Sequence, residues 1–139
     1  MKIENQISDY ISNQSDSKRA DLTVLHQLIL NQNPKLKLWF LDGKDENDKI
    51  ISNPNMGYGT YFIKYKNGTS KEFYRLGIST NTTGISIYIF GVEDKNFLKN
   101  TFGSRLGQAK ITSYCIKFKN LASIDFDVLK EIIQFGLNL

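Results

Sequence analysis

The sequence is poor in the residues that form disulfides, bind metals and act in acid–base catalysis. Among 139 residues there are one cysteine, one histidine and two prolines. A single cysteine, Cys115, excludes an internal disulfide and suits a reducing compartment. The only histidine, His26, would need a partner and a cleft to act as a general base, and neither is visible, so we expect a structural role for it. No metal site and no cofactor are predicted.

Long apolar runs are also missing. Polar residues interrupt each hydrophobic stretch within a few positions, far short of the ~20 residues that span a bilayer. Polar residues also follow directly after the start of the chain, where a secretory signal would be apolar. We therefore expect a cytoplasmic protein that does not enter a membrane. The length predicts one domain over residues 1–139.

Positive charge is concentrated in one part of the chain. The net charge is +4, but residues 59–119 alone have a balance of +7 and the remaining residues a balance of −3. Such asymmetry can mark a surface that meets an anion or nucleic acid. Solvated lysines on outward strand faces explain the same composition, and the sequence leaves both explanations open.

The sequence is rich in β-forming residues, above all over residues 57–90. Strong β formers with glycine near the turns predict three consecutive strands joined by two tight turns. In the third strand Ile85, Ile87 and Ile89 share one face, which should meet the helices. Alternation over residues 112–118 predicts a fourth strand.

The first turn of this stretch contains Asn67–Gly68, the strongest short hairpin signal. A two-residue turn would place Lys64 directly opposite Lys71, an unfavourable like-charge pair. A three-residue loop over residues 66–68 avoids that pair. We therefore expect the longer loop.

Helical patterns predict four helices around the strands, over residues 3–11, 16–31, 93–102 and 125–137. Asp125 can cap the last of them, and Gly103 is expected to end the third. The elements together predict an α+β fold, an antiparallel β-sheet of four to six strands with N-terminal and C-terminal helices packed on it.

A candidate ligand site follows from the alternation of the strands. We expect one polar strand face on which several side chains converge: Tyr58, Arg75, Tyr88, Cys115 and Lys117. Trp39 points away from the apolar residues of its own extended segment and is a further candidate platform for a ligand. The alternative is that its side chain covers the edge of the core. Lys117 beside Cys115 can lower the pKa of the thiol. A buried, inert cysteine is the alternative there.

An acidic segment covers residues 42–49, which read DGKDENDK. Carboxylate oxygens are ligands for hard cations such as calcium or ferric iron. The spacing is not that of an EF-hand, because a loop opened at Asp45 has Ile50 where glycine is needed and Met56 where glutamate is needed. A solvated surface insertion is the alternative.

Several weak motifs, taken together and in order, resemble the YdhG-like domain of unknown function. They are Trp39, Gly-Tyr-Gly-x-Tyr at 57–61, an aromatic strand closed by Asn-Gly at 65–68, Ile-x-Ile-Tyr-Ile at 85–89, Ser-x-Cys-Ile-x-Phe-x-x-Leu at 113–121 and Asp-x-x-Val-Leu at 125–129. The resemblance extends from Asp16 to Ile133. It implies an α+β fold with helices packed on an antiparallel sheet.

The same resemblance implies a possible metal role, because part of that family is described as frataxin-like iron chaperones. Two segments depart from the family pattern. Residues 79–83 read Ser-Thr-Asn-Thr-Thr where relatives tend to carry Pro-Arg-Lys, and residues 42–48 look like an insertion. An anion contact at the first segment and an inherited metal role at the second are therefore not implied.

From the polar strand face we expect a non-enzymatic binding module for a small anionic or aromatic ligand, since no nucleophile and base can be nominated. Two alternatives stay open. One is a frataxin-like iron chaperone that uses the acidic segment. The other is a nucleic-acid-binding protein that uses the basic residues 59–119, with tyrosines stacking on bases.

Overall fold

The computed structural model describes residues 2–139. Its helices are α1 (Ile3–Ser12), α2 (Asp16–Gln32), α3 (Phe97–Leu106) and α4 (Phe126–Leu137), with a 3-10 helix η1 (Leu121–Ser123). The strands are β1 (Leu38–Leu41), β2 (Asn55–Tyr58), β3 (Tyr61–Lys64), β4 (Ser70–Phe73), β5 (Leu76–Asn81), β6 (Gly84–Ile89), β7 (Ala109–Ile111) and β8 (Cys115–Phe118). The predicted α+β class is confirmed.

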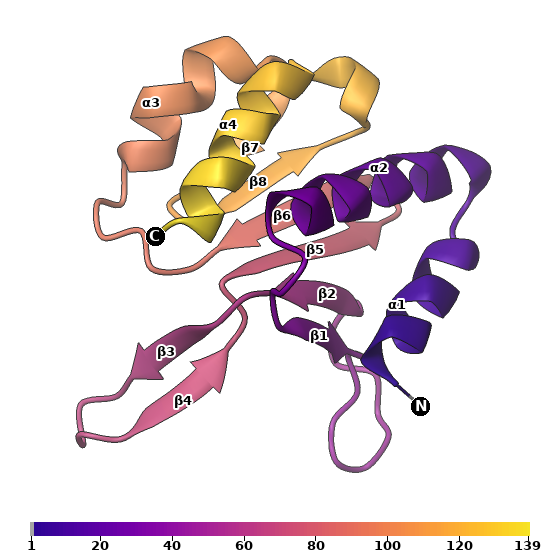
Figure 1. Cartoon of the computed structure of the whole chain (residues 1–139), viewed down its shortest axis with the longest axis vertical. Coiled ribbons are helices and arrows are strands. Elements are labelled where there is room, and N and C mark those ends of the chain that lie inside the picture. The colour runs from indigo at the N-terminus through magenta and orange to yellow at the C-terminus, as the bar shows by residue number, and fades with distance from the viewer. Residues whose placement is uncertain (1) are drawn as a thin grey trace.

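Six of the strands form one antiparallel sheet in the order β1-β2-β5-β6-β8-β7. The helices lie on one side of this sheet, so the fold has two layers (Figure 1). In the part of the chain that the structure describes, none of the helices combines the length and apolar character needed to cross a membrane.

The core lies between the sheet and the helices. The predicted isoleucine face of β6 is confirmed, since Ile85, Ile87 and Ile89 are fully buried against helical residues such as Leu25 and Leu129. Alternation then places every second residue of each strand on the opposite side. We call this side, which no helix covers, the outer face.

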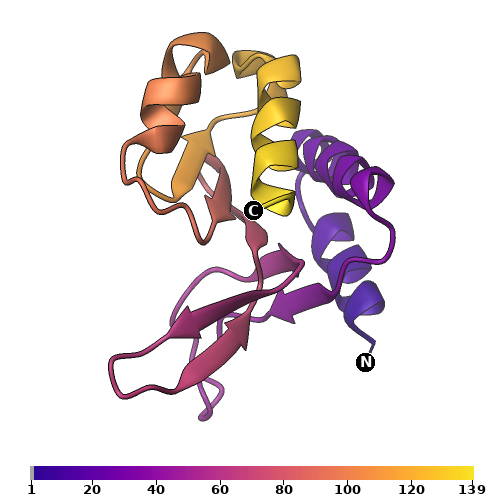
Figure 2. The ribbon, with the colours of Figure 1, turned by 60° about the vertical axis from the view of Figure 1, so that its left-hand side comes forward.

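Residues 57–90 form five strands where three were expected. Gly59, at φ +76°, ends β2, and the chain leaves the sheet there and returns at Arg75. The excursion is the hairpin of β3 and β4, a separate two-stranded sheet that projects away from the helices (Figure 2). A positive φ is easy only for glycine, so one residue turns an uninterrupted strand pattern into two strands.

The loop at the tip of this hairpin agrees with the prediction. The Tyr65 amide donates to the Thr69 carbonyl at 2.9 Å, which closes a loop of residues 66–68. Gly68 has φ +88°, and Lys71 pairs with Ile63. The Lys64–Lys71 pair is thereby avoided.

The third helix and the strand after it differ from the prediction. The helix α3 begins at Phe97, runs through Gly103 and ends at Leu106, before Gly107, whose φ is +105°. The following residues form β7, which was not predicted, and β8 is shorter than the expected strand over 112–118. The cap of α4 is confirmed, since the Asp125 carboxylate accepts from the Asp127 and Val128 amides at 3.0 and 3.3 Å.

Candidate functional site

Strand pairing places four of the six predicted site residues on the outer face: Trp39, Tyr88, Cys115 and Lys117. Arg75, which precedes β5, contacts Phe90 and Tyr61 instead of that group. Trp39, Gly57, Gly77, Tyr88 and Cys115 lie directly opposite one another across five strands. Lys117 lies in the next row of the same face, opposite Ser86. The chain therefore brings Tyr88, Cys115 and Lys117 together, as predicted.

Tyr58 does not lie on this face, and its predicted position was wrong. Its side chain is fully buried on the helix-facing side, and its hydroxyl lies 2.6 Å from Nδ1 of His26 on α2. Burial raises the pKa of the Tyr58 hydroxyl and lowers the pKa of the His26 ring. Both groups are therefore neutral at pH 7, and the expected structural role of His26 agrees with this contact.

Trp39 is on the predicted face but far from Lys117. Three strands separate β1 from β8, and at the usual strand spacing this amounts to about 19 Å. The Trp39 indole donates to the Gly59 carbonyl at 2.8 Å and lies under the Lys37 ammonium, 4.4 Å from it. Trp39 thus covers the edge of the sheet at the root of the hairpin.

Sequence reasoning missed Tyr74, which occupies the middle of the outer face. Gly57 and Gly77 face each other across β2 and β5, and the Tyr74 ring lies on both of them, so that a Cβ at either position would overlap it. Tyr74 is only 4% exposed. Two glycines in adjacent positions of neighbouring strands are the signal that could have revealed it, because such a pair leaves a hollow that a ring can fill.

Tyr74 belongs to a larger group that we call the aromatic cluster. Phe90 is at its centre, with ring centroids 5.5 Å from Phe73, 5.5 Å from Tyr74 and 5.9 Å from Tyr114. The full cluster is Trp39, Tyr61, Phe73, Tyr74, Tyr88, Phe90 and Tyr114. It joins the hairpin to the outer face of the sheet.

Arg75 lies at the edge of this cluster in a fixed orientation. Its Nη1 donates to the Phe90 carbonyl at 2.8 Å, and its guanidinium lies 4.8 Å from the centre of the Tyr61 ring. Gly91, at φ +93°, leaves room for it, since a Cβ there would overlap Nη1. Among residues 2–139 the ion pairs are Arg19–Asp16, Lys37–Glu72 and Arg105–Glu131, so Arg75 has no carboxylate partner.

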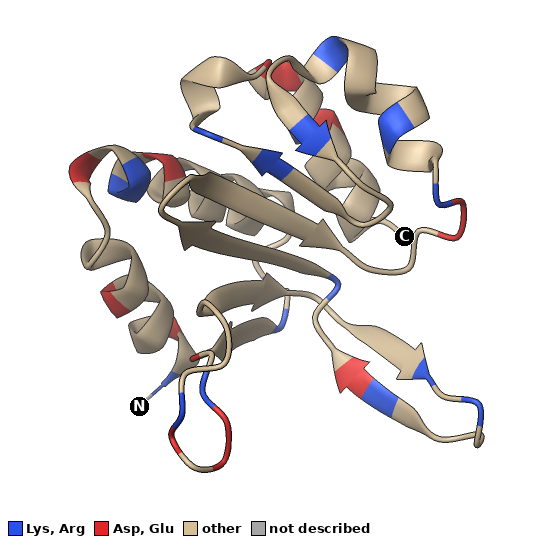
Figure 3. Cartoon of the chain, turned by 180° about the vertical axis from the view of Figure 1, so that it is seen from behind, with Lys and Arg blue, Asp and Glu red and all other residues tan. Residues whose placement is uncertain are grey.

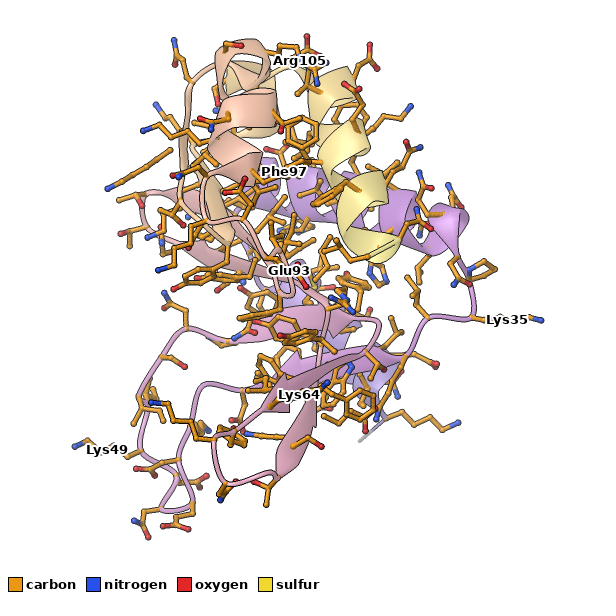
Figure 4. All side chains as sticks on the ribbon, turned by 90° about the vertical axis from the view of Figure 1, so that its left-hand side faces the viewer. Lys35, Lys49, Lys64, Glu93, Phe97 and Arg105 are labelled. Carbon is orange, nitrogen blue, oxygen red and sulfur yellow. The ribbon has the colours of Figure 1, made fainter. Side chains whose placement is uncertain are left out.

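A cleft of about 490 Å³ opens beside Arg75, and we call it the Arg75 cleft. In Figure 4, Glu93 lies between the helices and the hairpin, and Phe97 lies above it on α3. Phe97 stacks on Phe135, with ring centroids 4.7 Å apart. The residues that give the cleft its chemistry are Tyr61, Arg75, Glu93, Asp94, Phe97 and Phe135.

Cys115 has the character of a buried, inert cysteine. It is 4% exposed, opposite Tyr88. Burial raises the pKa of its thiol, and nearby Lys117 offsets only part of this increase. The thiolate that nucleophilic chemistry requires is therefore disfavoured.

Two of the four carboxylates of the acidic segment accept hydrogen bonds from backbone amides within it. Asp42 accepts from the Lys44 amide, and Asp45 accepts from the amides of Asn47 and Lys49. Within residues 2–139 no group of three or more His, Cys, Asp or Glu side chains is placed to hold a metal ion. These contacts match a solvated turn, and iron handling by this segment stays a prediction without support from its geometry.

Comparisons of the chain with protein-family models, with curated proteins and with solved structures found no match. The resemblance to the YdhG-like domain therefore stays a prediction.

Proposed function

We propose that the protein is a non-enzymatic binding module whose Arg75 cleft takes a small molecule with an aromatic ring and an anionic group. One observation carries this proposal. Arg75 is half-buried, is oriented by the Phe90 carbonyl and the Tyr61 ring, and has no carboxylate partner among residues 2–139. A held guanidinium with free N–H groups suits a carboxylate or phosphate, because it loses little freedom on binding.

The remaining walls of the cleft suit the rest of such a ligand. Phe97 and Phe135 provide stacked rings at one side, and Tyr61 provides another at the hairpin. Aromatic rings prefer offset or edge contacts with other rings. The cleft volume of about 490 Å³ is in the range of small-molecule sites.

Two exposed carboxylates narrow the class of ligand. Glu93 and Asp94 also line the cleft, and they would repel a ligand that carries only negative charge. A zwitterion places its anionic group at Arg75 and its cationic group at these carboxylates. An aromatic amino acid has all three features, and it is the ligand class that we propose.

The test is titration calorimetry of the purified protein with L-phenylalanine, with 3-phenylpropanoate, which lacks the ammonium group, and with phenethylamine, which lacks the carboxylate. We expect the amino acid to bind tightest. Replacing Arg75 by alanine should weaken its binding at least about tenfold, since a hydrogen bond to a charged group contributes roughly 1.5–3 kcal/mol.

Arg105→Ala is the matched control. Arg105 also lies near a ring, 5.5 Å from the centre of Phe102, but outside the cleft. Thermal melting without ligand reports whether either substitution damages the fold. Equal loss of binding in both variants, or no heat of binding with any of the three compounds, would overturn the proposal.

A further inference from the structure

A second polar groove lies at the opposite end of the strands from the Arg75 cleft. It has a volume of about 330 Å³ and is formed where the β5–β6 turn meets β7 and β8. Lys110, Lys117 and Lys119 line it together with Asn81, Ser86 and Gln108, and no Asp or Glu does. We call it the lysine groove. Figure 3 shows the basic residues of β7 and β8, with no acidic residue on the neighbouring strands.

The arrangement of the lysines in this groove lowers the stability of the folded protein. Lys110 and Lys117 are directly opposite each other in β7 and β8, and like charges in such positions destabilise a sheet. Neither forms an ion pair within residues 2–139. An anion between them would convert this repulsion into attraction.

A serine lies beside these lysines. Ser86 is 3% exposed, lines the lysine groove and lies opposite Lys117. A serine hydroxyl can donate a hydrogen bond to a phosphate oxygen, so Ser86 adds a polar group beside the lysines of the groove.

Stacked tyrosines lie directly beside the groove. Tyr88 follows Ser86 by two residues on the same face of β6, which is about 6.8 Å along the strand. The Tyr88 and Tyr114 rings stack with centroids 6.3 Å apart and an angle of 25° between them. Tyr114 is 49% exposed. Positive charge and aromatic rings therefore follow one another along the outer face, at about the spacing of neighbouring side chains on one face of a strand.

From this alternation we infer that the outer face between β6 and β7 binds single-stranded nucleic acid. Backbone phosphates lie at Lys110, Lys117 and Lys119, and bases stack on Tyr114 and Tyr88. Stacking of this kind takes any base and requires that the base is not already paired in a duplex. The inference does not depend on the Arg75 cleft.

The test is fluorescence anisotropy with a labelled oligo-dT of about eight nucleotides, which is within the usual site size for such surfaces. Contacts of three lysines with phosphates predict a slope of about −2 for the logarithm of the binding constant against the logarithm of salt concentration. The double substitution Lys110→Gln with Lys117→Gln should reduce this slope by about 1.4. It should not lower the melting temperature, because it removes a repulsive pair.

The matched control for charge is Lys64→Gln with Lys66→Gln, which removes the same charge from the hairpin. Both lysines are exposed and neither lines the lysine groove. We expect this variant to keep the affinity to within about twofold at 0.1 M salt, where the Debye length is about 10 Å. Equal losses in the two double variants would reduce the effect to net charge and overturn the inference.

Stacking has its own matched pair of variants. Tyr114→Ala should weaken oligonucleotide binding at least about fivefold, the lower end of what one base–aromatic stack contributes. Tyr65→Ala removes a tyrosine of nearly equal exposure, 48%, from the hairpin and should change little. An unchanged affinity in Tyr114→Ala would overturn the stacking role.

Two further probes separate nucleic acid from other polyanions. A blunt duplex of the same length should bind at least about tenfold more weakly than the single strand, since its bases are unavailable for stacking. Polyglutamate should compete only weakly, because it supplies charge without bases. No binding of the single strand at low salt, equal binding of the duplex, or equal competition by polyglutamate would each overturn the inference.

Discussion

His26 and Tyr58 make a neutral pair inside a protein whose surface is basic. The Tyr58 hydroxyl is fully buried and 2.6 Å from His26, so each group fills the hydrogen-bonding need of the other. Burial lowers the pKa of His26 from its ordinary value of 6.5. The pair is therefore sensitive to acid in a way that a Phe and Leu pair would not be.

We predict that this pair makes the protein less stable below pH 6.5. The unfolded chain takes up a proton at His26 as the pH falls through 6.5, whereas the folded protein resists it, so the unfolded state binds more protons. The stabilisation is complete above pH 6.5 and is lost on acidification toward the lowered folded pKa. The loss has a ceiling of ~1.4 kcal/mol per pH unit, and partial exposure reduces it.

Urea unfolding at pH 7.5 and pH 5.5 measures this effect above the range in which ordinary carboxylates titrate. The His26→Gln variant should be less stable at both values and should show a smaller difference between them. A variant with the same pH dependence as the unaltered protein would assign the effect to other groups.

The elements that were predicted correctly carry their signals in a few adjacent residues. Ile85, Ile87 and Ile89 define β6 and its buried face, and Asp125 defines the start of α4. The missed features depend on contacts that a local pattern does not contain. The strand break at Gly59 depends on a positive φ. The helix α3 continues for three residues beyond Gly103 because it is terminated at Gly107.

The residues of the candidate site also divide into those whose position a local pattern predicts and those whose position it does not. Alternation placed Tyr88, Cys115 and Lys117 on one face, because neighbouring antiparallel strands keep that face in common. The same pattern gave the wrong face for Tyr58. The residue of β2 that points to the outer face is Gly57, which has no side chain to mark that face in the sequence and is covered by Tyr74. Tyr61 and Phe90, which contact Arg75, are brought together only by the hairpin.

Two glycines in different elements should respond oppositely to alanine. In Gly77→Ala the new methyl group overlaps the Tyr74 ring, and we predict a loss of roughly 1–3 kcal/mol in the free energy of unfolding. In Gly103→Ala the nearest atoms outside the helix backbone are 3.6 Å and 4.0 Å away. Here we predict a gain of roughly 0.4–1 kcal/mol, because alanine restricts the unfolded chain.

Urea denaturation of both variants at pH 7 is the measurement. Each variant is the control for the other, since both add one methyl group to a glycine with a negative φ. If Gly77→Ala is as stable as Gly103→Ala, the Tyr74 ring does not lie on β5 as described.

At the scale of the whole molecule, the helices occupy one side of the sheet and leave the other to aromatic and basic side chains. The Arg75 cleft and the lysine groove lie at opposite ends of β5 and β6. Arg75 pairs with Phe90 and the groove begins at Ser86, so four residues, or about 14 Å, separate them along the strand. Of the ten Lys and Arg of residues 59–119, these two places hold four: Arg75 in the cleft and Lys110, Lys117 and Lys119 in the groove.

We predict that the two places act independently. Sites more than about 7–10 Å apart without shared partners usually contribute additively. The variant with Arg75→Ala, Lys110→Gln and Lys117→Gln should therefore lose amino-acid binding and oligonucleotide binding by the same factors as the separate variants. Anisotropy titrations with and without saturating L-phenylalanine provide the check. A change in oligonucleotide affinity beyond about twofold would indicate coupling through the aromatic cluster.

The position of Tyr74 gives the outer face its own reporter. An aromatic ring in a magnetic field shields the protons directly above and below its plane. In Gly57 and in Gly77, the α-proton that occupies the position of a Cβ lies against the Tyr74 ring, so its resonance should move upfield of ordinary glycine values. Those two signals would register any event that lifts the ring, including hairpin movement or ligand binding, without a label or a substitution on the face itself.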